Sequence, residues 1–238
     1  MRCKIAELLV DIPEAGGLAP CCRGYLTDGE NTPADIVIDA AQYRAELYPP
    51  EYREDEEFVA YMESGRQFFR NLLKFNGMML HSSALEYQGK AYLFSGPSGV
   101  GKSTHSKLWQ QTFGSAAQVF NDDKPILRFL DGRWFAYGAP WCGKDDINQN
   151  KKVPLAGICF MRQGKENTIR QLSPQEAAIH ILWQTQRFLV AENLDRLLPL
   201  VDRLAQTIPV YELENDATRD SVRLSCETMR RGAEEAGL

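Results

Sequence analysis

One octapeptide constrains this chain more than any other stretch: Gly96-Pro97-Ser98-Gly99-Val100-Gly101-Lys102-Ser103. It fits the pattern G-x-x-x-x-G-K-[ST], follows the apolar run Tyr92-Leu93-Phe94, and precedes a predicted helix over residues 102–113. Glycines let backbone N–H groups turn inward around a phosphate, and a helix N-terminus adds its dipole. A glycine-rich turn with a chance lysine would not explain the flanking strand and helix. The segment therefore predicts a strand–loop–helix unit that binds phosphate in an α/β fold.

The residue types in this loop indicate a nucleoside triphosphate with Mg²⁺ as the ligand. Lys102 can place its charge on the β- and γ-phosphates, and the Ser103 hydroxyl can bind Mg²⁺. We therefore expect ATP and Mg²⁺ as cofactors, although no sequence motif identifies which nucleotide base is recognised. The candidate nucleotide-binding residues are Gly96, Ser98, Gly99, Val100, Gly101, Lys102, Ser103 and Thr104.

Motifs of other nucleotide-dependent classes are missing from the sequence. The segment Asn150-Lys151-Lys152-Val153 lacks the aspartate of the N-K-x-D base reader, and no D-x-x-G occurs. The H-R-D and D-F-G motifs of eukaryotic-type protein kinases are absent as well. A GTPase that moves a partner is therefore disfavoured.

Two adjacent carboxylates, Asp122 and Asp123, end the apolar run that follows the predicted helix. At a strand end both can turn toward a bound phosphate, where one helps to hold Mg²⁺ and the other accepts a proton from an attacking hydroxyl. Which aspartate is the base stays open; Ser103 and Asp123 are the candidate metal ligands. The alternative is a solvated turn, because Asn-Asp-Asp-Lys-Pro is also favourable turn chemistry.

His81 ends the apolar run Met78-Met79-Leu80, which a turn at Gln88-Gly89-Lys90 folds back toward the strand before the glycine-rich loop. A cation at this position could tune the aspartates. A histidine packed in the core is an equally good interpretation. The candidate catalytic residues are Asp122, Asp123, His81 and Lys102.

The pattern of apolar residues predicts a mixed-sheet α/β protein with a small β-rich N-terminal segment. Residues 1–75 are expected to form a β-layer followed by an amphipathic helix over about 55–75, and residues 76–238 the phosphate-binding core. Within the core, residues 78–87 and 91–95 are expected to be strands. Ser173-Pro174-Gln175-Glu176 fits a capping box with proline at the first helical position, so a helix should begin there.

The composition argues against nucleic acid, membranes and zinc as partners of this chain. The net charge of −5 argues against duplex nucleic acid or an anionic membrane as the main partner. No apolar run reaches the roughly 18 residues of a membrane span, and we expect a cytoplasmic protein. The six cysteines share no metal-ligand spacing, so reduced thiols are expected rather than a zinc site. A monomer and a homo-oligomer are both compatible with the sequence.

The order of His81, the glycine-rich loop and Asp122-Asp123 resembles the HPr kinase/phosphorylase family and its wider group with ATP-dependent phosphoenolpyruvate carboxykinase. The resemblance covers roughly residues 76–172 and is strongest to short HPr-kinase-like proteins, some of which sit in peptide-biosynthesis gene clusters. It includes His81-Ser82-Ser83, residues 96–104, Asp122-Asp123 and Pro140-Trp141-Cys142-Gly143-Lys144. The resemblance implies a P-loop kinase core and Mg²⁺-dependent phosphoryl transfer to serine, with Asp122 or Asp123 as base and His81 in support.

The loop at 138–144 has two interpretations. Trp141 and Gly143 suit a flexible wall over the phosphoryl acceptor, and Lys144 could neutralise transferred charge. Alternatively, Asp145 and Asp146 pair with Lys144 in a plain surface loop.

These observations predict a kinase that transfers the γ-phosphoryl group to a serine or another hydroxyl on a peptide, a protein or a small molecule. The alternative is a nucleotide-binding regulatory or accessory protein without turnover. The carboxylate pair favours the kinase, because a protein that only binds nucleotide needs no additional base.

Overall fold

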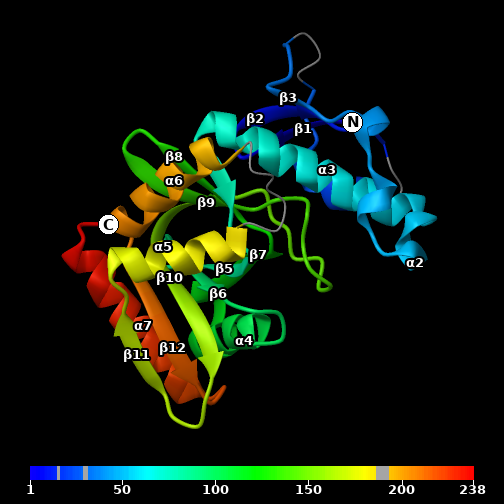
Figure 1. The fold of residues 1–238 in the computed structure, drawn as a ribbon. Helices are drawn as coiled ribbons and strands as arrows, with labels where there is room; N and C mark the ends of the chain where they lie inside the picture. Colours follow the sequence, from blue (N-terminus) through cyan, green and yellow to red (C-terminus); the bar gives the residue numbers. More distant parts are fainter. Residues whose placement is uncertain (15–16, 29–31, 186–192) are drawn as a thin grey trace.

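The computed structural model describes residues 1–14, 17–28, 32–185 and 193–238 and is a mixed α/β protein (Figure 1). Its strands are β1 Arg2–Ile5, β2 Leu8–Asp11, β3 Ile36–Val37, β4 Gly77–Met79, β5 Ser82–Tyr87, β6 Lys90–Ser95, β7 Ala117–Asp123, β8 Ile126–Leu130, β9 Arg133–Tyr137, β10 Lys152–Gln163, β11 Thr168–Gln171 and β12 Val210–Asn215. Its α-helices are α1 Ala19–Cys22, α2 Pro50–Arg53, α3 Glu56–Leu72, α4 Lys102–Phe113, α5 Pro174–Thr185, α6 Leu194–Thr207 and α7 Arg219–Glu235.

The central sheet is mixed, as the sequence predicted. Across it the strands run in the order β7-β5-β6-β10-β12-β11. Strands β6, β10 and β12 are parallel to one another, whereas β5, β7 and β11 join by antiparallel pairing. The β5–β6 connection is the predicted tight turn, in which Gln88 and Gly89 have φ values of 53° and 74°. Two successive positive φ values give the type of turn that matches the strand twist in a two-residue hairpin.

Strand β10 belongs to two parts of the sheet. Its first residues, Lys152–Pro154, pair antiparallel with β9, which continues through β8 to β4. From Leu155 onward, β10 pairs with β6. The long strand thereby joins the antiparallel part of the sheet to the part that carries the glycine-rich loop.

Helices cover both faces of the central sheet. Leu93 and Val210 lie in one hydrophobic cluster with residues of α5 and α6, whereas Phe94 and Tyr211 lie in another cluster with residues of α4 and α7. Neighbouring residues of a strand point to opposite faces, so this alternation buries both sides of the sheet.

The N-terminal segment forms a small layer at one end of the molecule (Figure 1). Strands β1, β2 and β3 form a three-stranded sheet, and α3 begins after Asp55, whose carboxylate accepts the Phe58 N–H. Phe68 of α3 shares a hydrophobic cluster with Ile5, and also with Met79 and Ile126 of the antiparallel part. In the described residues no helix is both long enough and apolar enough to cross a bilayer.

The prediction of one strand over residues 78–87 is wrong. The chain leaves the ladder at Leu80 and His81, between β4 and β5. The His81 backbone N–H donates to the Gln184 carbonyl of α5 at 3.2 Å instead of to a neighbouring strand. This break attaches His81 to a helix that lies about 100 residues further along the chain.

Candidate functional site

The glycine-rich loop lies between the end of β6 and the start of α4, where the sequence predicted it. Gly96, Gly99 and Gly101 have φ values of 144°, 82° and 101°, a region that side chains disfavour. A Cβ atom on Gly96 would also lie 3.0 Å from the carbonyl oxygen of Met161 in β10. These glycines therefore allow the backbone to curl closely over the end of the sheet.

Lys102 is the first residue of α4, and only 9% of its surface is exposed. Its ammonium group donates to the carbonyl oxygens of Gly96 and Pro97 at 3.1 and 3.2 Å. The charge is thus held over the loop, in the position from which it could contact a phosphate.

Asp122 is joined to the start of α4. The Ser103 hydroxyl donates to Asp122 Oδ2 at 2.9 Å, which brings a hydroxyl and a carboxylate oxygen side by side. The Asp122 carbonyl accepts the Gly143 backbone N–H at 2.8 Å. Hydroxyl and carboxylate oxygens form the hard donor set that Mg²⁺ prefers, so this pair fits the predicted cofactor.

Asp123 has a different set of partners. Its Oδ1 atom lies 3.1 Å from His81 Nε2, and its Oδ2 atom contacts the ammonium of Lys124. Its φ of 95° departs from extended geometry, so the usual alternation of side chains fails at the end of β7. Both carboxylates consequently line the same cavity.

The environment of Asp123 favours its ionised form. Burial raises the pKa of this carboxyl group, but the hydrogen bond with His81 and the charge of Lys124 lower it by more. The net result is a pKa well below the usual range for aspartate. Asp123 is therefore a carboxylate at neutral pH and can accept a hydrogen bond from a neighbouring hydroxyl.

Gln184 holds His81 in place, a role that the sequence did not predict. His81 Nδ1 lies 3.0 Å from Gln184 Oε1, in addition to the backbone hydrogen bond to the same residue. The two ring nitrogens therefore contact two different side chains, those of Gln184 and Asp123, which fixes the orientation of the ring. No local pattern could have identified Gln184, because it is 103 residues from His81.

One cavity of about 510 Å³ gathers most of the predicted site residues. His81, Lys102, Ser103 and both aspartates line it. The predicted residues Gly96 and Val100 do not line it, and Val100 packs against a hydrophobic cluster instead. The complete lining is His81, Ser98, Gly99, Gly101, Lys102, Ser103, Thr104, Asp122, Asp123, Gly143, Lys144 and Asp145.

The interpretation of Trp141 as part of a flexible wall is wrong. Its side chain is 1% exposed, stacks on Phe68 at 4.8 Å and donates to Ser64 Oγ at 3.1 Å. Trp141 therefore anchors the loop in the hydrophobic core, as the burial of a large aromatic ring favours. Gly143 and Lys144, which follow it, do reach the cavity.

The alternative interpretation paired Lys144 with Asp145 and Asp146. In the part of the chain that the structure describes, Asp145 does not pair with Lys144. That carboxylate pairs with Lys107 of α4 at 2.7 Å. The ion pair joins the loop to the helix that follows the glycine-rich loop, and Lys144 is exposed at the cavity wall.

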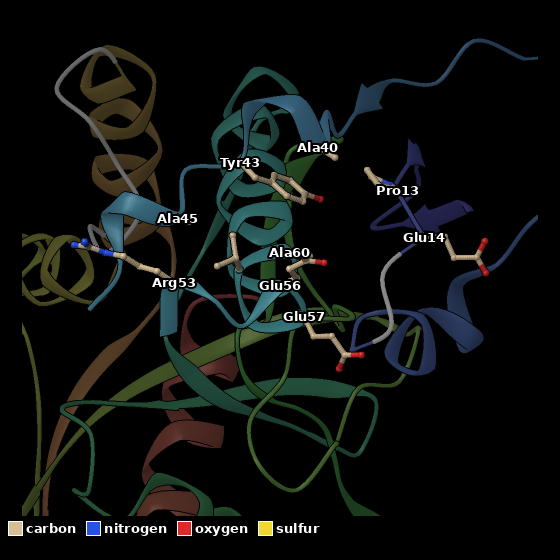
Figure 2. Close-up of a pocket in the computed structure, with 10 residues that line it drawn as sticks. Pro13, Glu14, Ala40, Tyr43, Ala45, Arg53, Glu56, Glu57 and Ala60 are labelled. Carbon is tan, nitrogen blue, oxygen red and sulfur yellow. The ribbon is translucent and has the colours of Figure 1, made fainter. Parts of the chain in front are cut away.

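A second cavity of about 580 Å³ lies between the N-terminal segments and α3 (Figure 2). Glu14, Glu56, Glu57 and Arg53 supply its charged side chains. Three carboxylates against one guanidinium would repel a triphosphate, and no predicted site residue lines this cavity. The cavity at the glycine-rich loop is therefore the better candidate for a nucleotide, although it is slightly smaller.

Comparisons with known proteins identify a family and a solved structure with a similar fold. No curated protein matches the chain. The chain is similar to the structure of the Hpr(Ser) kinase/phosphatase from Coxiella burnetii, with 11% identity, a TM-score of 0.40, and coverage of 66% of this chain and 98% of that one. The family model described as SynChlorMet cassette protein ScmC matches residues 45–219. Because this match covers well over half of the 238 residues, the chain belongs to the ScmC family.

Proposed function

We propose that this chain is a Mg²⁺-dependent kinase that transfers the γ-phosphoryl group of ATP to a serine or another hydroxyl on a peptide, a protein or a small molecule. One observation carries the proposal: a single cavity joins the glycine-rich loop to two carboxylates with separate partners. A protein that only binds nucleotide needs the first of these carboxylates but not the second.

The cofactor is held by the loop and by the start of α4. Backbone N–H groups of the loop and the Lys102 ammonium bind the phosphates. Ser103 and Asp122 hold Mg²⁺, which neutralises charge on the phosphate oxygens when it is bound. The hydrogen bond between these two residues favours Asp122 in this role over Asp123, the metal ligand expected from the sequence.

Asp123 is the base. The acceptor hydroxyl oxygen forms the new bond to the γ-phosphorus of ATP, and the hydroxyl proton passes to Asp123. The bond between that phosphorus and the oxygen that bridges it to the β-phosphate breaks, and ADP leaves with this oxygen. His81 and Lys124 keep the carboxylate ionised and fix its orientation. The low pKa makes Asp123 a weak base, which suits a loose transition state in which the proton is transferred late.

The test compares the two aspartates as a matched pair. The full chain is incubated with γ-labelled ATP, Mg²⁺ and serine-containing peptides, with serine-to-alanine peptides as the acceptor control. Asp123→Asn should lower transfer by roughly 10²–10⁴ while ATP binding is retained. Asp122→Asn should instead raise the Mg²⁺ concentration needed for half-maximal nucleotide binding.

Two results would contradict the proposed kinase activity. Normal transfer by Asp123→Asn would show that this residue is not the base. ATP binding without transfer to peptides, proteins or small hydroxyl compounds would identify the chain as a nucleotide-binding accessory protein.

A further inference from the structure

Two thiols and a carboxylate meet beside the candidate active site, although they are far apart in the sequence. Cys21 belongs to α1 in the N-terminal layer, whereas Cys142 and Asp146 belong to the loop between β9 and β10. One ligand atom of each residue lies within 4.8 Å of the other two. The sequence pointed to no metal site because the spacing of these residues has no recognisable pattern.

The local geometry suits a small cation that prefers sulfur. Cys142 Sγ lies 4.0 Å from Asp146 Oδ1 and 3.3 Å from the side-chain nitrogen of Asn148, an N–H donor that can stabilise a thiolate. In a tetrahedral zinc site with Zn–S bonds of about 2.3 Å, two sulfur atoms lie about 3.8 Å apart. Ligand atoms within 4.8 Å of one another therefore need to move by about 1 Å or less.

Burial at the cluster leaves a path for an ion. Cys142 is buried, Cys21 is half-buried and Asp146 is exposed, so the carboxylate lies on the solvent side. Three protein ligands with one side open to water correspond to a tetrahedral site whose fourth position is taken by solvent.

We propose that Cys21, Cys142 and Asp146 bind a thiophilic divalent cation of the Zn²⁺ class. The two thiols bind as thiolates and release their protons to solvent, and water completes the coordination. Mg²⁺ and Ca²⁺ should bind this site poorly, because these ions prefer oxygen ligands. The site is separate from the Ser103–Asp122 pair and does not depend on the proposed kinase activity.

The bound cation would tie α1 to a loop that lines the phosphate cavity. The Cys142 backbone N–H donates to the hydroxyl of Tyr61, and that hydroxyl donates to the Cys142 carbonyl, both at 2.8 Å. The next residue, Gly143, donates its N–H to the Asp122 carbonyl. The cation therefore fixes the loop immediately next to one of the paired carboxylates.

Cobalt provides the test, because Co²⁺ replaces Zn²⁺ in tetrahedral sites and absorbs light when thiolates coordinate it. Co²⁺ alone is titrated into the full, metal-free chain under reducing conditions. We expect one equivalent to give sulfur-to-cobalt charge-transfer absorption and Zn²⁺ to abolish it, since Zn²⁺ binds such sites more tightly than Co²⁺.

Variants assign the ligands. Cys21→Ser and Cys142→Ser should each lose about half or more of the charge-transfer absorption, because each removes one of the two thiolate ligands. Asp146→Asn should weaken Co²⁺ binding at least tenfold while retaining it. Cys226→Ala, which removes a buried thiol from α7, is the matched control and should bind Co²⁺ normally. Cys21 and Asp146 are not fully buried, so circular dichroism should show native folding for their variants.

Two results would overturn the proposal. Co²⁺ binding without charge-transfer absorption would place the ion on oxygen ligands, such as those of the phosphate cavity. Absorption of undiminished intensity in Cys21→Ser would show that this thiol is not a ligand.

Discussion

At the scale of single residues, the paired aspartates show how neighbours in sequence acquire different chemistry. Asp122 accepts a hydrogen bond from Ser103, whereas Asp123 faces His81 and Lys124. The positive φ of Asp123 lets both side chains reach one cavity from the end of one strand. Strained backbone of this kind is concentrated at functional sites, where the surrounding structure maintains it.

Lys102→Ala tests whether the loop binds nucleotide. Removing the ammonium should weaken ATP binding by more than tenfold, about 1.4 kcal/mol or more, measured by calorimetry. Lys107→Ala is the matched control, because Lys107 lies on the same helix and pairs with Asp145. Equal affinities of wild type and Lys102→Ala would contradict nucleotide binding at this loop.

His81→Ala tests the coupling between the histidine and Asp123. The hydrogen bond from His81 holds the pKa of Asp123 below its usual value, so removing the ring should raise that pKa. The turnover rate should fall, and the acidic limb of the pH–rate profile should move to higher pH, with ATP affinity nearly unchanged.

The control for this experiment is His180→Ala, which removes a histidine of α5 that packs against Phe160 instead of lining the cavity. Its profile should match that of the wild type. If His81→Ala has a lower melting temperature but an unshifted pH–rate profile, His81 is only a packing residue.

At the scale of elements, α4 contains a buried histidine, His105, one turn after the glycine-rich loop. Trp109 Nε1 donates to His105 Nε2 at 3.2 Å, and the same ring nitrogen lies 3.1 Å from the hydroxyl oxygen of Ser225 in α7. Burial lowers the pKa of His105 to about 4. Protonation of this ring therefore opposes the packing of α4 against the sheet.

This burial predicts how stability depends on pH. The folded-state pKa of His105 lies below the ordinary value of 6.5, so its contribution is complete above pH 6.5 and is lost as the pH falls toward 4. The loss is at most roughly 3 kcal/mol in the free energy of unfolding. Denaturant unfolding of wild type and His105→Gln between pH 7 and 4.5 should show a flatter dependence in the variant. Parallel curves would contradict this assignment.

Local signals in the sequence predicted most elements, because they act over a few residues. The capping box at the start of α5 is formed as expected: Ser173 N–H donates to the Glu176 carboxylate at 2.9 Å, and Glu176 N–H donates to the Ser173 hydroxyl at 3.3 Å. Contacts across the fold were not predictable in this way. The support of His81 by Gln184 and the meeting of Cys21 with Cys142 depend on how distant segments pack.

At the scale of the whole molecule, one hydrophobic cluster joins the N-terminal layer to the antiparallel part of the sheet. Ile5, Phe68, Met79 and Trp141 share this cluster. It extends across the boundary at residue 75 that we expected between the N-terminal segment and the core.

Trp141→Ala tests how much this cluster stabilises the molecule. The substitution removes the stack on Phe68 and the hydrogen bond to Ser64, and should lower the free energy of unfolding by about 3–5 kcal/mol. Trp183→Ala is the control, because Trp183 is 70% exposed and should change stability by roughly 0.5 kcal/mol or less. Chemical denaturation of both variants measures the difference. A loss below about 1 kcal/mol in Trp141→Ala would contradict the anchoring role.

Strand β10 has a consequence for how the chain folds. It pairs with β9 at its start, and further along with β6 and β12, which both lie far from β10 in the sequence. Pairings of this kind close long loops before they gain contacts, which slows folding. Neither part of the sheet is complete until β10 is in place. A disturbance that frees this strand therefore opens both parts in one cooperative step.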